Sequence, residues 1–435
     1  MVPTWSDTLY PPPLTKMTDG TVKQTNPFSG TQVWTVPGRA HRPLNVASPA
    51  VKPLDPAGVD HFCAFCPGRL MDTPPEKSRI TVGSAIRTGL TASQLTEDPW
   101  NFRRVPNLFE ILSYDYWAKN YGYQLSHSDR DRMQRYLADP AGRQHVDDIV
   151  TTKLQASGIE STATARENAT LSFFGGGHEL IIGRHHFQPG ATRSDQLASA
   201  GTLTPDEHAA FFELSADAMH SIYAHNRYVR YVQVFQNWLK PAGASFDHLH
   251  KQLVGIDQPP VWAAREETLL RQNPNLYNEA AVDYAGYHNL VLAENEHAVM
   301  LAGVGHRYPC LEVWSRSEHA QPFDHTTDEL RGVSDLVQAM HAATGPLVPA
   351  NEEWYAQPIG SVVNMPWRVL MKWRVSTLAG FEGGTKIYVN TIDPWTLRDR
   401  VLPELFRLRD EGLIAETVAI GEECSYRLNS LRYLD

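Results

Sequence analysis

The sequence lacks the features that mark membrane, secreted and nucleic-acid-binding proteins. No apolar run approaches the roughly 18 residues that a membrane-spanning helix requires. The N-terminal segment has neither the basic nor the apolar region of a signal peptide, and four cysteines in 435 residues are too few for a disulfide framework. These absences predict a protein of the reducing cytoplasm that has no membrane partner.

Positive charge is scarce as well. Lysine and arginine number 39 against 49 acidic residues, which gives a formal net charge of -10. This balance argues against a nucleic-acid partner, because binding to a phosphate backbone requires a basic face. Small phosphorylated substrates are still compatible, since a pocket needs only a few local donors. Apolar residues make up 42% of the chain and charged residues 20%, as in a globular protein with a sizeable core.

The strongest chemical signal is the segment 243–256, which contains His248, His250 and Gln252 in the pattern His-x-His-x-Gln before an apolar run. Alternate residues of a strand share one face, so we expect two imidazoles and an amide to point toward one spot. Imidazole can bind a metal or act as a nucleophile, and an amide can donate a hydrogen bond to a phosphoryl oxygen. An exposed strand with a polar face is the alternative interpretation of this triplet.

A second signal is the Cys-x-x-Cys spacing of Cys63 and Cys66, which suits a metal site or a redox pair. The Pro-Gly and Thr-Pro-Pro sequences that follow are loop signals, and they favour a zinc knuckle. Structural zinc takes four nitrogen or sulfur ligands, and the chain has no second Cys-x-x-Cys. The remaining ligands would therefore be histidines.

The rest of the pattern predicts an α+β chain with a weak internal duplication. Pro-rich residues 1–25 are expected to form a flexible arm. The predicted first copy has strands in 31–36, 100–109, 170–182 (two strands around a glycine turn) and 232–237, with helices in 115–158 and 204–226. The predicted second copy has strands in 289–302, 309–314, 360–375 and 385–390, with helices in 327–343 and from Asp393. The reactive histidines lie in the first copy only.

Six motifs occur in an order that resembles the galactose-1-phosphate uridylyltransferase family of the histidine-triad superfamily. They are Asn26-Pro-x-Ser-Gly with Arg39-Ala-x-Arg42-Pro, Cys63-x-x-Cys66-Pro-Gly with Thr73-Pro-Pro-Glu76, Val-Pro-Asn107-x-Phe, His178-Glu-Leu-Ile-Ile continuing to His186, Val234-Phe-x-Asn237, and Gly243-x-Ser245-x-x-His248-x-His250-x-Gln252. The resemblance covers most of residues 26–400. It implies two tandem histidine-triad-like halves, 26–257 and 258–435, each an antiparallel sheet with packed helices, and a homodimer.

The resemblance also implies a role for each matched residue. One structural zinc per chain would be held by Cys63, Cys66, His186 and His248, with His185 as the alternative to His186. His250 would be the nucleophile, and Gln252 would stabilise charge on the phosphoryl oxygens. The implied substrate-binding residues are Arg39, Arg42, Asn107, Asn237, Gly243, Ser245 and, on the sugar side, Glu382.

Three functions follow as expectations. The first is transfer of a nucleoside monophosphate, UMP in galactose metabolism, from a nucleoside diphosphate sugar to a sugar 1-phosphate through a nucleotidyl-histidine. The second is phosphorolysis of a nucleoside diphosphate sugar or a dinucleoside polyphosphate, with inorganic phosphate as the acceptor. The third is a zinc-stabilised binding protein without catalysis, against which the presence of both His250 and Gln252 argues.

The sequence departs from the family pattern at three places. Leu249 replaces the proline of His-Pro-His. Glu266 matches a glutamate that holds a second metal in some members, but residues 369–375 contain no His-x-His, so we predict no second metal. Gly380-Phe-Glu382 resembles the family's Gly-Tyr-Glu, whereas residues 383–390 do not follow the pattern, which leaves the sugar acceptor open.

Overall fold

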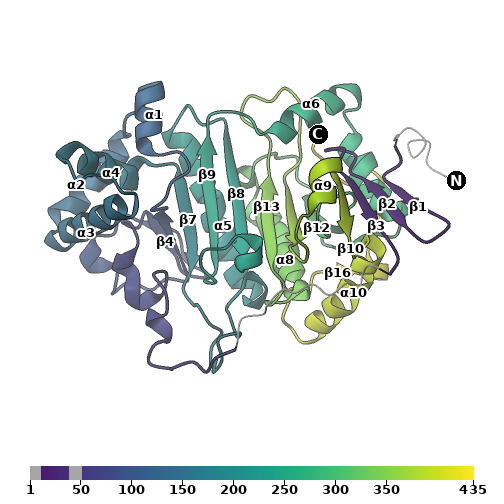
Figure 1. Ribbon diagram of the computed structural model, residues 1–435, viewed down its shortest axis with the longest axis horizontal. Helices are drawn as coiled ribbons and strands as arrows, with labels where there is room; N and C mark the ends of the chain where they lie inside the picture. Colours follow the sequence, from purple (N-terminus) through teal and green to yellow (C-terminus); the bar gives the residue numbers. More distant parts are fainter. Residues whose placement is uncertain (1–10, 39–50) are drawn as a thin grey trace.

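The computed structural model describes residues 11–38 and 51–435. Two sheets organise these residues, a large sheet of 12 strands and a small sheet of 4 strands. In spatial order the large sheet consists of β16 (Ala419–Ile420), β10 (Val291–Glu294), β11 (Ala298–Ala302), β12 (Cys310–Ser315), β14 (Arg368–Trp373), β13 (Ala350–Tyr355), β8 (Tyr231–Trp238), β9 (His250–Ile256), β7 (His178–Gly183), β6 (Phe102–Pro106), β4 (Ser78–Ile80) and β5 (Arg87–Thr88). Neighbouring strands in it pair antiparallel, from one edge to the other (Figure 1).

The first half of the large sheet packs against α5 (Pro205–His225) and carries four helices at its outer end (Figure 1). The N-terminus of α5 is fixed by a capping box, in which Thr204 accepts from the Glu207 backbone and the Glu207 carboxylate accepts from the Thr204 backbone. The outer helices are α1 (Tyr114–Tyr121), α2 (His127–Ala138), α3 (Pro140–Ala156) and α4 (Ala163–Gly175). The predictions of helices in 115–158 and 204–226 are therefore confirmed.

One strand prediction in this half is wrong. Residues 170–175 were expected to form a strand before the glycine turn, but they are the last turns of α4, and only β7 is a strand in this region. Ala169, Ser172 and Phe173 are buried at the i, i+3, i+4 spacing of a helix. The short apolar run is therefore compatible with either a strand or a helix, and its packing partners decide between the two.

The second half repeats the arrangement with α8 (Thr327–Thr344), which has its own capping box at Thr326 and Glu329. Helix α10 (Pro394–Asp410) begins after Asp393, whose side chain caps it as the sequence predicts. In the predicted strand region 360–375 only β14 forms, since residues 359–367 are irregular. The expected two-half α+β architecture is confirmed. Among the described helices, none has the length and apolar character needed to cross a bilayer.

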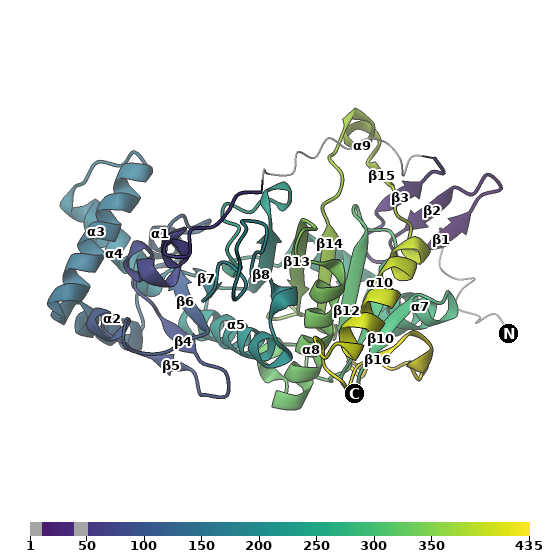
Figure 2. The same ribbon diagram turned by 90° about the horizontal axis from the view of Figure 1, so that it is seen from below.

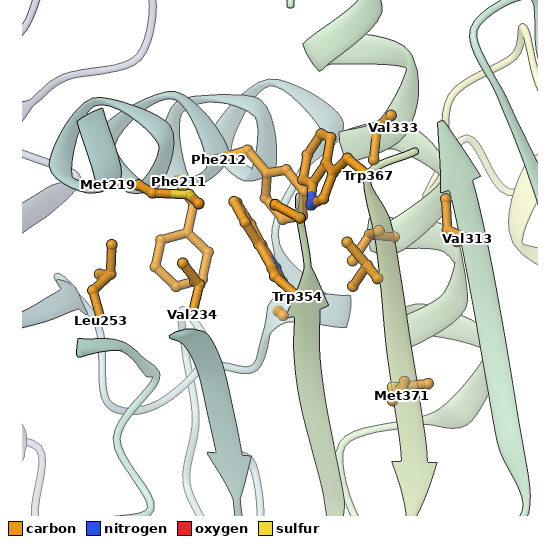
Figure 3. Close-up of a cluster of buried hydrophobic side chains, with 14 of the residues drawn as sticks. Phe211, Phe212, Met219, Val234, Leu253, Val313, Val333, Trp354, Trp367 and Met371 are labelled. Carbon is orange, nitrogen blue, oxygen red and sulfur yellow. The ribbon is translucent and has the colours of Figure 1, made fainter. Parts of the chain in front are cut away.

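The two halves share one sheet and one core. β8 and β13 pair from Trp238↔Ala350 to Phe235↔Glu353, so the ladder is continuous across the seam. Beneath the seam, Phe212 of α5 contacts Trp354 of β13 with ring centroids 4.8 Å apart, and Trp354 contacts Trp367 at 4.9 Å (Figure 3). Figure 2 shows α5 and α8 together on this side of the sheet and α9 (Gly380–Thr385) on the opposite side.

The small sheet is made of β1 (Leu14–Lys16), β2 (Val22–Thr25), β3 (Gln32–Thr35) and β15 (Ile387–Asn390). Residues 14–25, which the sequence assigned to a flexible arm, thus form two strands, because Val22 and Gln24 alternate with less buried neighbours and pair with β3. Residues 1–10 lie outside the described residues. β15 pairs in parallel with β3, so a segment of the second half joins the N-terminal strands in this sheet. The division of the chain at residue 257 stays a prediction.

Candidate metal centre and active site

Four side chains that the sequence singled out as metal ligands meet beside the first half of the large sheet. They are Cys63, Cys66, His186 and His248, whose ligand atoms all lie within 4.8 Å of one another. The Cys63 sulfur is 3.3 Å from Nδ1 of His186, 3.4 Å from Nδ1 of His248 and 3.7 Å from the Cys66 sulfur. Ligands in a tetrahedron around zinc are about 3.3–3.8 Å apart. This group could hold a metal ion.

The donor atoms are in the right chemical state for a metal. Nε2 of His248 donates to the carbonyl oxygen of Gly183 at 2.6 Å, which leaves the lone pair of Nδ1 directed at the sulfurs. A hydrogen bond from the Cys63 thiol lowers the pKa of Cys66, and the same contact raises the pKa of Cys63. This contact favours the thiolate form of Cys66, and the thiolate is the form that binds metals.

The structure resolves the choice that the sequence left open between two adjacent histidines. His186 is buried and contributes Nδ1 to the cluster, whereas His185 is exposed and does not belong to it. Adjacent residues in an extended segment point to opposite sides. The ring of His186 is further held by Phe187, stacked at 4.4 Å, and by Phe62 at 4.8 Å.

The expectation that His248, His250 and Gln252 converge on one spot is only half correct. β9 begins at His250, and His248 precedes it in a bend that turns its ring toward the cysteines. His250 and Gln252 lie on one face of β9. Nδ1 of His250 donates to the carbonyl oxygen of His248 at 2.7 Å, so the proton is fixed on Nδ1 and the lone pair on Nε2. Burial lowers the pKa of His250 to about 4, which keeps the ring neutral.

Between these two residues, Lys251 points to the opposite face of the sheet. It is completely buried, forms an ion pair with Glu352 of β13, and lies 4.8 Å from the rings of Phe211 and Phe212 of α5. Alternation along β9 therefore places the cation beneath the sheet, among the helices, and the histidine and amide above it.

His178 is a neighbour of Gln252, although the sequence analysis gave it no role beyond membership of a motif. Nε2 of His178, at the start of β7, lies 3.2 Å from Oε1 of Gln252 and 3.0 Å from Nδ2 of Asn107. The side-chain oxygen of Asn107 accepts from the backbone of Phe109 at 2.9 Å. The structure thus brings Asn107 and Gln252, from segments far apart in the sequence, to one buried imidazole.

Asn237 lies on the same face at the seam between the halves. Phe235 is opposite Gln252 in the β8–β9 ladder, which places Asn237 opposite His250 two residues farther along. Asn351 of β13 donates to Oδ1 of Asn237 at 2.7 Å, and Arg374 donates to Oδ1 of Asn351 at 2.6 Å. Sequence reasoning missed Asn351 and Arg374, because each lies outside the motifs and reaches the site only through strand pairing.

The loop before β9 brings Gly243 to this group. Gly243 has φ 91°, a left-handed conformation that a side chain disfavours, and an added Cβ would lie 3.8 Å from Nδ2 of Asn237. Ser245 of the same loop is exposed. Glu382 lies in α9, where its carboxylate accepts from the backbone of Ala379 at 3.1 Å. Arg39 and Arg42 fall outside the described residues.

Glu266, the residue matched to a second metal site, has a protein cation as its partner. One terminal nitrogen of Arg368 lies 2.7 and 2.8 Å from the two carboxylate oxygens, and both side chains are 4% exposed. The guanidinium is surrounded by five aromatic rings: Phe28, Trp262, Tyr277, Trp314 and Tyr355. Arg368 therefore neutralises Glu266. It directly precedes residues 369–375, in which the family's His-x-His is absent.

Comparison of the sequence with known proteins gives two matches. A family model described as a domain of unknown function, DUF4921, matches residues 17–433. The ADP-glucose phosphorylase of Arabidopsis thaliana is 23% identical over 380 residues, which cover 84% of this chain and 88% of that protein.

Two solved structures share the fold. The crystal structure of an ADP-glucose phosphorylase from Arabidopsis thaliana with bound ADP-glucose superposes with a TM-score of 0.57 at 17% identity, covering 88% of this chain and 98% of that chain. A GalT-like protein from Arabidopsis thaliana superposes with a TM-score of 0.53 at 18% identity, covering 78% of this chain and 91% of that chain. At this level of identity the likeness shows the fold alone.

Proposed function

The chain belongs to the DUF4921 family, and we propose that it is a divergent member of the galactose-1-phosphate uridylyltransferase family that transfers a nucleoside monophosphate from a nucleoside diphosphate sugar to a phosphate acceptor. The observation that carries this proposal is the orientation of His250. Its Nδ1 proton is held by the carbonyl of His248, which directs a neutral Nε2 lone pair away from the backbone. A buried neutral imidazole held in one tautomer suits a nucleophile.

The reaction proceeds in two displacements at one phosphorus atom. Nε2 of His250 attacks the α-phosphorus, an N–P bond forms, and the P–O bond to the β-phosphate breaks, so that sugar 1-phosphate leaves. An oxygen of the acceptor phosphate then attacks the same phosphorus, and the N–P bond breaks to restore neutral His250. The covalent intermediate spares the enzyme a direct encounter between two anionic substrates.

The neighbours of His250 supply donors for the charged oxygens. Gln252 offers an NH₂ group next to the nucleophile on the same strand face. Such a donor stabilises negative charge that develops on the phosphoryl oxygens. Asn237 is opposite His250. Its Oδ1 accepts from Asn351, and Oδ1 of Asn351 accepts from Arg374. The NH₂ groups of Gln252 and Asn237 are the donors that a phosphate oxygen at His250 can use.

The Cys63, Cys66, His186 and His248 group would hold one zinc ion. When bound, zinc supplies a closed, four-ligand crosslink with no free coordination position, which is a structural role. His248 transmits this rigidity to His250 by its carbonyl oxygen. His250 itself contributes no ligand atom to the group.

Phosphorolysis is the preferred form of the reaction. A relative that matches 84% of this chain and 88% of its own length is an ADP-glucose phosphorylase, which supports an adenine nucleotide sugar as donor and inorganic phosphate as acceptor. The sequence alone favoured UMP transfer to a sugar 1-phosphate. Glu382, the residue matched to the sugar side, accepts from the backbone of Ala379 at the start of α9.

Mass spectrometry of the intact protein tests the proposal. The protein is incubated with ADP-glucose, UDP-glucose, UDP-galactose and GDP-mannose in turn. We expect the mass of one nucleoside monophosphate to be added with the true donor, and the adduct to be acid-labile, as a phosphoramidate is. His250→Ala should keep its metal and form no adduct. Turnover by His250→Ala, or an adduct mapped to another histidine, would overturn the covalent mechanism.

The second half-reaction separates the two acceptors. The labelled protein is isolated and exposed to inorganic phosphate or to a sugar 1-phosphate. Discharge by phosphate with release of a nucleoside diphosphate supports phosphorolysis, and discharge only by the sugar 1-phosphate supports the transferase. Gln252→Ala should form the adduct slowly, with a loss of about 2–4 kcal/mol of transition-state stabilisation. Binding of nucleotide sugars without any adduct or turnover would favour the non-catalytic alternative.

A further inference from the structure

His178 is a buried histidine to which the proposed mechanism gives no role. It begins β7, is 2% exposed, and pairs with Val254 of β9. Residues opposite each other in an antiparallel ladder share a face, so His178 lies on the face that carries Gln252 and His250. Its two ring nitrogens have different partners, and these partners define where its proton is.

The backbone fixes the tautomer of His178. The N–H of Ile111 donates to Nδ1 at 3.1 Å, and only an unprotonated nitrogen can accept. The proton of the neutral ring is therefore on Nε2, which lies 3.2 Å from Oε1 of Gln252 and donates to it. Burial lowers the pKa of His178, which keeps the ring in this single neutral form.

We propose that His178 is a positioning residue that holds the carboxamide of Gln252 with its oxygen turned inward and its NH₂ group turned toward the phosphate at His250. This inference rests on the proposed function, because it concerns the donor that acts on the reacting phosphate. A carboxamide without such a partner can rotate by half a turn, which exchanges its donor and its acceptor. An oxygen presented to a phosphate would repel it, so the orientation decides whether Gln252 helps or hinders.

The arrangement makes two histidines complementary. His250 is protonated on Nδ1, because that nitrogen faces a carbonyl oxygen, and it presents a lone pair to the substrate. His178 is protonated on Nε2, because its Nδ1 faces an N–H group, and it presents a donor to Gln252. Each tautomer is set by a backbone group on the opposite side of the ring from the site.

Asn107 adds a further donor beside the same imidazole. Its Oδ1 accepts from the Phe109 backbone, so its NH₂ group is the part that faces Nε2 of His178 at 3.0 Å. Two N–H groups at this distance repel each other. The proton on Nε2 of His178 is therefore directed to Oε1 of Gln252 and not to Asn107.

Two substitutions of His178 separate positioning from a purely structural role. Glutamine places an NH₂ group near the position of Nε2 and can donate to Gln252. Asparagine places an oxygen near the position of Nδ1 and can accept from Ile111, but it is too short to reach Gln252. His145→Gln is the matched control, because His145 is also buried but bonds Tyr136 and Thr73, away from the site.

Adduct formation from the nucleotide-sugar donor is measured for each variant, with metal content and melting temperature as checks on folding. We expect His178→Asn to form the adduct about 10–100-fold more slowly at saturating donor with an unchanged KM. His178→Gln should stay within about threefold of the wild-type rate. The reverse order, in which asparagine preserves the rate and glutamine abolishes it, would show that the Ile111 contact matters and would overturn the proposal.

A double-mutant cycle with Gln252→Leu tests whether His178 acts through Gln252. If it does, His178→Asn has no further effect on the rate in the Gln252→Leu background. Equal fold-losses in both backgrounds would overturn the proposal. If the wild-type protein and His178→Asn form the adduct equally fast, the positioning role is refuted. The proposed function is then still supported, because the adduct forms.

The positioning itself can be tested without turnover. The ¹⁵N shifts of histidine distinguish the two neutral tautomers, and the His178 signal is identified by its loss in His178→Gln. We expect the Nε2–H form between about pH 6 and 8 in the unliganded protein. An Nδ1–H tautomer would overturn the inference even if the wild-type protein forms the nucleotide adduct.

Discussion

Lys251 and Glu352 form a completely buried ion pair that joins the strand of His250 to the second half of the chain. Glu352 also accepts from Nε2 of His341 at 2.8 Å and from Nε1 of Trp354 at 2.5 Å. Lys251 lies between His250 and Gln252 in the sequence. The ion pair therefore fixes which face of β9 points toward the helices and which face carries His250 and Gln252. The site above the sheet depends on an electrostatic contact below it.

Lys251→Met is expected to lower the free energy of unfolding by about 3–5 kcal/mol, because it leaves the Glu352 carboxylate buried without its cation. Denaturant unfolding of the intact chain measures the loss. The surface pair of Arg271 and the half-buried Glu267 is the control, since Glu267→Gln should cost no more than about 1 kcal/mol. A loss below about 1 kcal/mol for Lys251→Met would show that the pair contributes little.

One zinc ion per chain is expected by metal analysis of the purified protein. Cys63→Ala and His248→Ala should each lose the metal and unfold more easily, since a closed four-ligand site stabilises the fold first and activity as a consequence. Cys310→Ala is the matched control, because Cys310 is buried in β12 and does not belong to the four-residue group. Full metal retention in both ligand variants would contradict the assignment.

A second metal at Glu266 is not expected. The guanidinium of Arg368 already lies within hydrogen-bond distance of both carboxylate oxygens, and a divalent cation there would meet the positive charge of the arginine. Metal analysis should give close to one equivalent after incubation with excess zinc, iron or manganese. A stoichiometry near two, lost in Glu266→Gln, would refute this prediction.

Acid should unfold the protein partly through Glu179. Burial alone would raise the pKa of this carboxyl, but Arg104 and Lys77 lower it from 4.5 to about 2. A group whose pKa is lower in the folded state stabilises the fold above its unfolded pKa, and this contribution is lost as pH falls through the folded value. The free energy of unfolding should therefore decrease between about pH 4.5 and 2.

Glu179→Gln is the variant that checks this assignment. It removes the titrating group, so the slope of unfolding free energy against pH in that window should be smaller than in the wild-type protein. The variant should also be less stable at neutral pH, because Arg104 and Lys77 lose their buried counter-ion. An unchanged slope would mean that other carboxyl groups dominate acid unfolding.

Some errors of sequence reasoning have a common physical cause. The run around Phe173 and Phe174 is apolar enough for a strand, and its helical state is set by packing within the layer of α1 to α4. The choice between His185 and His186 depended on which side of an extended segment faces the cysteines. The sequence does not define which of two adjacent side chains points to that side. His178, Asn351 and Arg374 reach the site by strand pairing across long separations.

The sequence by itself determined what depends on neighbouring residues and on residue chemistry. Thr204 with Glu207 predicts a helix start, Asp393 predicts another, and two cysteines with histidines predict a metal site, because caps and ligands act over a few bonds. Tertiary structure alone decided which nitrogen of His250 and of His178 carries the proton. A tautomer is set by the backbone group facing the ring, and that group is brought there by the fold.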